Sequence, residues 1–174
     1  IYRTNFFGRL TNQDHLEDDI CDRFQYSGVK NWAKNVPGQD IFSLDKIFFP
    51  MNDSKMHWNV AVAYMQEHRI EMYCSIGDKE IKQLRLLMRY IHDEHQEKKG
   101  VPLPDEKSWT LIPCQPNTPH QRNGKFSVNP EFTSHRKQIS LSFQKGFDCG
   151  VYTCLYVDFL SINNPLVFTQ EDLF

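Results

Sequence analysis

A cysteine at the start of an expected helix is the residue of this sequence best suited to nucleophilic chemistry. In the stretch SFQKGFDCGVYTC, a polar run reaches Cys149 and an apolar helical pattern follows. The unpaired N–H groups and the positive dipole end of a helix start favour a thiolate. Gly150 leaves the approach to the sulfur uncrowded. Cys149 is therefore a candidate nucleophile, and the alternative is a small buried hydrophobe.

A histidine in an expected strand is the candidate base. The run HWNVAVAY, residues 57–64, is rich in β-branched and aromatic residues. His57 shares one face of this strand with Asn59 and two alanines, whereas Trp58 lies on the more apolar face. A histidine on the small, polar face is expected to line a cleft. The alternative is a structural histidine with satisfied hydrogen bonds.

The next strand brings a third group to this histidine. The linker MQEH, residues 65–68, predicts a hairpin in which Tyr64 faces Arg69. In that register Cys74 is the diagonal neighbour of His57 on the same face. A base of this kind needs a group that accepts a hydrogen bond from its second ring nitrogen. A thiol accepts poorly, so Cys74 occupies the expected position of the orienting group without the best chemistry for it.

Two further residues precede the cysteine. Gln144 lies in a loop that must fold back toward the helix start, and its side-chain amide is a candidate donor toward the sulfur. With the backbone N–H of Cys149 it would form an oxyanion hole. Asp148 is expected to cap the helix.

The elements that must position these residues form a mixed pattern. We expect a helix over 14–26, strands at 46–51, 57–64 and 69–76, a helix from Asp78 to about Lys98, a strand at 108–112, an irregular segment at 113–138, and a last helix from about Cys149 to the sequence INNP. Asp78 is expected to cap its helix. This order predicts an α+β domain with helices against a central, mostly antiparallel sheet.

Composition narrows the class of protein. The 174 residues are 40% hydrophobic with a net charge of −2, which fits one globular domain over 1–174 and gives no basic field for nucleic acid. No apolar run is long enough to cross a membrane, and no signal peptide opens the chain. We therefore expect neither nucleic acid nor membrane as a partner, and a monomer.

The cysteines favour a reducing compartment. There are five, without a C-x-x-C pair, which argues against a disulfide scaffold and a zinc site. We expect an intracellular protein, nuclear and/or cytoplasmic, without cofactor or metal. Cys21 and Cys154 fall within helical patterns and are expected to be buried. A metal site from His92, His95 and His120 is the weakest alternative.

Several stretches resemble the ubiquitin-like-protein-specific cysteine proteases, the SUMO or sentrin deconjugating family. They are FFPMNDSKMHWNVAVAY, IEMYCSIGD and QKGFDCGVYTCLYVDFLS, and the ending NPLVFTQEDLF is similar as well. Near the start, HLEDDI is similar to the family's W-L-N-D-x-I signature. The resemblance covers nearly the whole chain, and its pairing of His-Trp with Asp-Cys-Gly is highly specific.

The resemblance implies a papain-like α+β fold and a single catalytic domain. It implies cleavage after the C-terminal Gly-Gly of a ubiquitin-like modifier, with a SUMO-like modifier favoured, by deconjugation, precursor processing or both. In this reading Cys149 is the nucleophile, His57 the base and Gln144 the oxyanion-hole donor. Trp58 would help roof the tunnel for the Gly-Gly tail, and Asp18 would contact the body of the modifier.

The sequence departs from the family at four places. Cys74 stands where the family has its catalytic aspartate, and Gln144 precedes Cys149 by five residues instead of six. His15 replaces the first tryptophan of the tunnel, which predicts a looser clamp on the tail. The segment 113–138 looks like an insertion.

Cys74 leaves three explanations open: an introduced substitution, an enzyme that runs on a Cys–His dyad, or a modifier-binding domain without catalysis. A related clan of acyltransferases with a similar His…Cys order is a further alternative. It would need a site for acetyl-CoA, for which basic residues of the irregular segment are candidates, namely Arg122, Lys125, Arg136 and Lys137.

Overall fold

A four-stranded sheet forms the centre of the protein. The computed structural model describes residues 1–11, 24–53, 57–121 and 148–173. Its strands are β1 (Lys46–Asp53), β2 (His57–Tyr64), β3 (Arg69–Tyr73) and β4 (Thr110–Ile112), in the order β1-β2-β3-β4. The first three pair antiparallel, and β4 runs parallel to β3. The expected α+β class with a mostly antiparallel sheet is confirmed.

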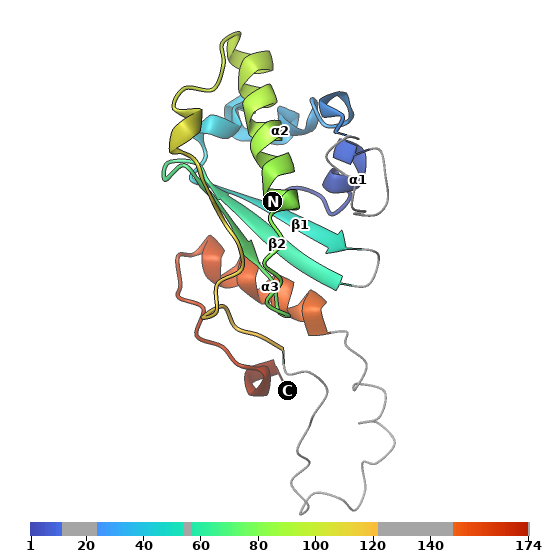
Figure 1. Ribbon diagram of the computed structural model, residues 1–174, viewed down its shortest axis with the longest axis vertical. Coiled ribbons are helices and arrows are strands. Elements are labelled where there is room, and N and C mark those ends of the chain that lie inside the picture. The colour runs from blue at the N-terminus through green and yellow to red at the C-terminus, as the bar shows by residue number, and fades with distance from the viewer. Residues whose placement is uncertain (12–23, 54–56, 122–147, 174) are drawn as a thin grey trace, which may run out of the picture.

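Helices cover both faces of this sheet (Figure 1). The helices α1 (Phe6–Thr11) and α2 (Lys82–Lys99) lie on one face, and α3 (Asp148–Ser161) lies on the other. Short 3-10 helices connect them, at Tyr26–Gly28, Trp32–Asn35, Pro37–Gln39, Ile41–Ser43, Glu106–Ser108 and Gln170–Leu173. None of the helices in the described residues is long and apolar enough to cross a membrane.

The alternation of β2 divides the core in two. Ala61 and Ala63 pack into the larger cluster beneath α1 and α2, whereas Val60 and Val62 pack against α3. The β-branched face of β2 lies close to α3, whereas α2 lies closer to β3 than to β2. Beyond His57 the small face is closed, because Asn59 and both alanines are buried.

The hairpin register follows the expectation. Tyr64 faces Arg69, and the ladder continues to Val60 opposite Tyr73. The expected strand over 69–76 is too long, however, because β3 ends at Tyr73. A turn replaces its last residues: the N–H of Gly77 donates to the carbonyl of Cys74 at 3.1 Å, and Gly77 has a φ of +73°. Glycine adopts that conformation without strain.

The start of α2 differs from the expectation. The helix begins at Lys82 instead of Asp78, and the carboxylate of Asp78 accepts the N–H of Glu80. The side chain of Glu80, not that of Asp78, accepts the N–H groups of Ile81 and Lys82. An acidic residue does satisfy the first N–H groups, but it lies two positions later than the sequence suggested.

The expected helix at Cys149 is present, with two corrections. Asp148 is its first residue, and its carboxylate accepts a hydrogen bond from the Gln170 side chain at 2.9 Å. It thus ties α3 to the last 3-10 helix instead of acting as the expected cap. Cys154 is exposed and not buried, because its side of α3 faces solvent.

Some expectations fall wholly or partly outside the described residues. The helix over 14–26 is one, and within it Tyr26 begins a 3-10 helix. Cys21 lies outside them as well. Of the irregular segment 113–138, residues 113–121 are described and contain neither helix nor strand.

A buried acid on α2 predicts how stability depends on pH. Glu94 is 1% exposed, its Oε2 accepts the Tyr26 hydroxyl at 2.5 Å, and its Oε1 has no hydrogen-bond partner among the described residues. Burial raises the pKa of this carboxyl, partly offset by the Tyr26 hydroxyl and by Lys98. A raised folded-state pKa gives stability that is present at acidic pH and is lost as pH rises through that pKa.

We therefore expect Glu94→Gln to raise the free energy of unfolding at pH 8 by about 1 kcal/mol and to change it little at pH 4. Urea unfolding between these pH values measures the difference. Glu106→Gln, at an exposed position whose charge does not affect the Glu94 pKa, is the control and should show no such trend. A difference that does not vary with pH would contradict the assignment.

Candidate active site

The sulfur of Cys149 lies against the first residues of β2. The backbone N–H of Trp58 donates to Cys149 Sγ across 3.3 Å. Cys149 is 2% exposed, yet it belongs to neither hydrophobic cluster. Its position at the second residue of α3 places the sulfur at the positive end of that helix. The surroundings are thus those of a polar, nearly enclosed sulfur and not of a core filler.

His57 and Cys74 are in direct contact, as the hairpin register suggested. Nε2 of His57 lies 3.2 Å from Cys74 Sγ. His57 is half-buried and is followed directly by Trp58, which contacts the Cys149 sulfur. The structure therefore gathers Cys74, His57 and Cys149 at one end of the sheet, with the imidazole touching the residue at position 74.

The turn after β3 sets the protonation of the Cys74 sulfur. Cys74 is fully buried, and burial raises the pKa of its thiol. The backbone N–H groups of Ile76 and Asp78, in the same turn, partly offset that rise. The thiol at position 74 is therefore protonated.

The protonated thiol has a consequence for the imidazole. A carboxylate at this position would accept the Nε2 proton and leave Nδ1 bare to act as a base. A thiol is a weak acceptor and can instead donate its own proton to Nε2. The imidazole is then held less firmly in the tautomer that a general base requires.

Trp58 also approaches the residue after the cysteine. A Cβ on Gly150 would lie 3.8 Å from Cδ1 of Trp58, with no closer described neighbour. That distance is an ordinary van der Waals contact, so among the described residues nothing requires glycine at position 150. The indole nevertheless lies beside the first turn of α3, near the sulfur.

Three predicted site residues lie outside the described residues. They are Gln144, His15 and Asp18. The oxyanion-hole role of Gln144 and the substrate-contact roles of the other two stay predictions, as do the roles of Cys149, His57, Cys74 and Trp58.

The segment before residue 122 contributes contacts that the sequence did not indicate. Gln121 bonds twice to Ser75: its backbone N–H donates to the Ser75 carbonyl at 2.9 Å, and its side-chain oxygen accepts the Ser75 hydroxyl at 3.1 Å. Cys114 Sγ lies 3.3 Å from the Cys74 carbonyl. The register of the β2–β3 hairpin does place Ser75 beside the site. The sequence of residues 113–121 has no periodicity, however, that would have predicted that Gln121 bonds to Ser75.

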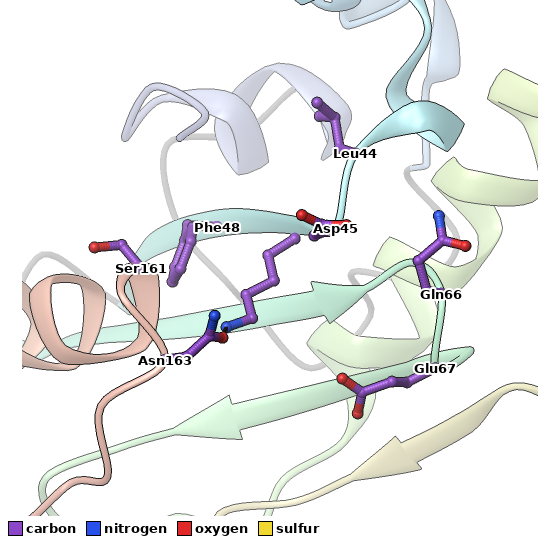
Figure 2. Close-up of a pocket in the computed structure, with 8 residues that line it drawn as sticks. Leu44, Asp45, Phe48, Gln66, Glu67, Ser161 and Asn163 are labelled. Atoms are coloured by element: carbon purple, nitrogen blue, oxygen red, sulfur yellow. Dashed lines mark hydrogen bonds between the residues drawn. The ribbon is translucent and has the colours of Figure 1, made fainter.

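A separate cleft lies at the opposite end of the sheet. It has a volume of about 500 Å³, and Figure 2 shows Ser161 and Asn163 from the end of α3 across from Asp45 and Gln66. Its lining contains neither cysteine nor histidine among the described residues. Lys46, which also lines it, donates to the carbonyl of Leu160 at 2.8 Å and so caps α3. The described lining of this cleft therefore offers no candidate nucleophile or imidazole base, whereas the end of the sheet at Cys149 offers both.

The three histidines considered for a metal site, His92, His95 and His120, make other contacts. Nδ1 of His92 lies 3.1 Å from the Asp93 carboxylate, and Nδ1 of His95 lies 2.9 Å from the Val101 carbonyl. His120 packs against Gly77. Within the described part of the chain, no group of three or more His, Cys, Asp or Glu residues is arranged to hold a metal ion.

Comparisons with known proteins agree with this geometry. A model of the Ulp1 protease family, C-terminal catalytic domain, matches residues 2–173. Sentrin-specific protease 2 of Pongo abelii is 28% identical over 149 residues, which are 85% of this chain and 21% of that protein. Ubiquitin-like-specific protease 1A of Arabidopsis thaliana is 30% identical over 173 residues, 99% of this chain and 28% of that protein. The chain thus spans less than a third of these curated relatives.

A solved structure has the same fold. The C-terminal Ulp1 protease domain in complex with SMT3, the yeast ortholog of SUMO, matches with a TM-score of 0.59 and 22% identity, over 98% of this chain and 60% of that chain. The papain-like α+β fold expected from the sequence is therefore confirmed.

Proposed function

Because the chain belongs to the Ulp1 protease family, we propose that it is a thiol protease that cleaves after the C-terminal Gly-Gly of a ubiquitin-like modifier. The observation that carries this proposal is that Cys149, at the start of α3, lies against the strand that begins with His57. The backbone N–H of Trp58, the residue after His57, donates to Cys149 Sγ at 3.3 Å. A SUMO-like modifier is the favoured substrate, since relatives are named for sentrin and a structural neighbour is bound to SMT3.

The proposed reaction is acyl transfer through sulfur. The Cys149 thiolate attacks the carbonyl carbon after Gly-Gly and forms a C–S bond. The C–N bond to the substrate lysine then breaks, and His57 donates its proton to the leaving amine. Water, losing a proton to His57, attacks the thioester and releases the modifier carboxylate and the cysteine. No cofactor takes part.

The site favours a slender substrate tail. Cys149 is almost enclosed, and Trp58 lies beside its helix. Two glycines present no side chain, so their backbone can enter where any other residue would collide. Gln144 as oxyanion donor, and Asp18 and His15 as contacts to the modifier, complete the proposal.

Two alternatives differ in chemistry. A modifier-binding domain without catalysis is supported by Cys74 at the orienting position, because a thiol helps His57 little. An acyltransferase has less support, since the matching family model is that of proteases. The proposal further includes a monomeric, intracellular enzyme, nuclear and/or cytoplasmic, that deconjugates isopeptides, processes precursors or does both.

Electrophile-tipped modifiers test the proposal directly. We expect a SUMO-like modifier ending in a vinyl sulfone to form a covalent adduct of about 1:1 stoichiometry with Cys149, detected by intact mass. Ubiquitin and Nedd8-like probes serve as comparisons for specificity. A folded protein with a reduced Cys149 that forms no adduct with any probe would refute the protease and leave the binder. Acetyl-CoA-dependent self-labelling would instead favour the acyltransferase.

A further inference from the structure

The contact between His57 and Cys74 needs support from outside the sheet. The hydrogen-bonded ladder between β2 and β3 ends at Val60 opposite Tyr73, so Cys74 lies one residue beyond it. The carbonyl of Cys74 accepts the N–H of Gly77 at 3.1 Å within the turn. These bonds are internal to the turn and do not fix where the turn lies relative to His57.

Ser75 makes two bonds to a residue outside the turn, in addition to the contact of Cys114 Sγ with the Cys74 carbonyl at 3.3 Å. Ser75 is fully buried, and its hydroxyl donates to the side-chain oxygen of Gln121 at 3.1 Å, while its carbonyl accepts the Gln121 N–H at 2.9 Å. A buried hydroxyl without a partner is costly. The two bonds therefore fix both the backbone and the side chain of the residue next to Cys74.

The attachment continues to the helix that carries Cys149. The Tyr152 hydroxyl donates to the carbonyl of His120 at 3.0 Å, and the Tyr156 hydroxyl donates to that of Pro119. Both tyrosines are buried in α3. Nε2 of His120 lies 2.9 Å from the position that a Cβ on Gly77 would take, so the segment also packs on the far end of the turn.

We propose that Ser75 and Gln121 are a positioning pair that holds the turn at 74–77, so that Cys74 Sγ stays against Nε2 of His57. Neither residue reaches the reacting atoms in this assignment. The pair acts through Cys74 and links its turn to α3. The expected effect of the pair on catalysis rests on the proposed protease function. The hydrogen bonds of the pair and the position of Cys74 against His57 do not depend on that function.

Four variants test the pair. Ser75→Ala and Gln121→Met each remove the side-chain bond. Gln121→Met leaves the buried Ser75 hydroxyl without this partner, whereas Ser75→Ala removes that hydroxyl, so Ser75→Ala is the variant expected to keep the fold. Gln121→Glu keeps an oxygen that accepts from Ser75. The double variant Ser75→Ala/Gln121→Met removes no side-chain bond between the two residues beyond the one that each single variant already removes. Ser161→Ala and Gln66→Ala, both at exposed positions, are matched controls.

We expect Ser75→Ala and Gln121→Met each to lower kcat on a SUMO-like substrate about tenfold with little change in KM. The pH profile of Cys149 alkylation should shift in both. The double variant should be no slower than the slower single one, and Gln121→Glu should retain most of the wild-type rate at the profile plateau. Additive losses, or a Gln121→Glu variant as slow as Gln121→Met, would overturn the proposal, because the amide would then act independently of Ser75.

NMR of the His57 imidazole tests the pair without requiring an active enzyme. We expect the ¹⁵N resonances of His57 to move in Ser75→Ala and Gln121→Met and to stay in place in both controls. If the wild-type protein proves inactive but these resonances move, the proposed function fails and the positioning pair stands. Unmoved resonances in folded variants overturn the pair, whatever the activity.

Discussion

Replacement of Cys149 with alanine is expected to abolish turnover and leave the fold intact. The sulfur is the atom that forms the acyl intermediate, and loss of a nucleophile of this kind in a catalytic triad has cost about 10⁶ in kcat. Because we expect Cys74 to weaken the starting enzyme, the loss expected here is about 10⁴. Hydrolysis of a SUMO-like modifier carrying a C-terminal fluorophore measures it, together with loss of the electrophile adduct.

Cys154→Ala provides the matched control, since Cys154 is an exposed cysteine five residues along the same helix. It should keep its full rate and its adduct. Binding of the unreactive modifier should be the same in both variants, because the proposed contacts to the modifier's body are made by other residues. Equal turnover in wild type and Cys149→Ala would show that the observed activity is not thiol chemistry.

Substitution of Cys74 with aspartate is expected to accelerate the enzyme by about 10². An aspartate would accept the Nε2 proton of His57, hold the tautomer and stabilise the imidazolium. The backbone N–H groups of Ile76 and Asp78, which favour negative charge at this position, would partly offset the cost of burying a carboxylate. The loss of about 10⁴ on removing the corresponding aspartate of a serine protease sets the upper limit.

The direction of the pH effect follows from the same contact. A buried carboxylate beside His57 raises the pKa of the imidazole, so the thiolate–imidazolium pair persists to higher pH. The basic limb of the pH profile of kcat should therefore move up in Cys74→Asp. Cys74→Ala is the control without an acceptor and should stay within a few-fold of wild type. A folded Cys74→Asp variant with an unchanged rate and profile would show that position 74 does not orient the imidazole.

The alternation of residue types along the chain correctly predicted the β2–β3 hairpin and the contact between Cys74 and His57. The run at 57–64 is a strand with those bounds, and the four-residue linker set the register that carries Cys74 to His57. Short hairpins leave few alternative pairings, so alternation and linker length suffice. The prediction was poorer at element ends: β3 stops at Tyr73 and α2 begins at Lys82, where turns bonded through Gly77 and Glu80 replace the expected regular structure.

The sequence by itself determined the α+β class, the hairpin register and the identity of the candidate nucleophile, because these depend on periodicity and on residues near one another in the chain. Only the tertiary structure placed Cys149 against the Trp58 N–H, buried the Cys74 sulfur and brought Gln121 to Ser75. Such contacts join irregular backbone to distant elements. Their geometry is set by how α3 and the segment 113–121 pack on the sheet, and no local pattern encodes that packing.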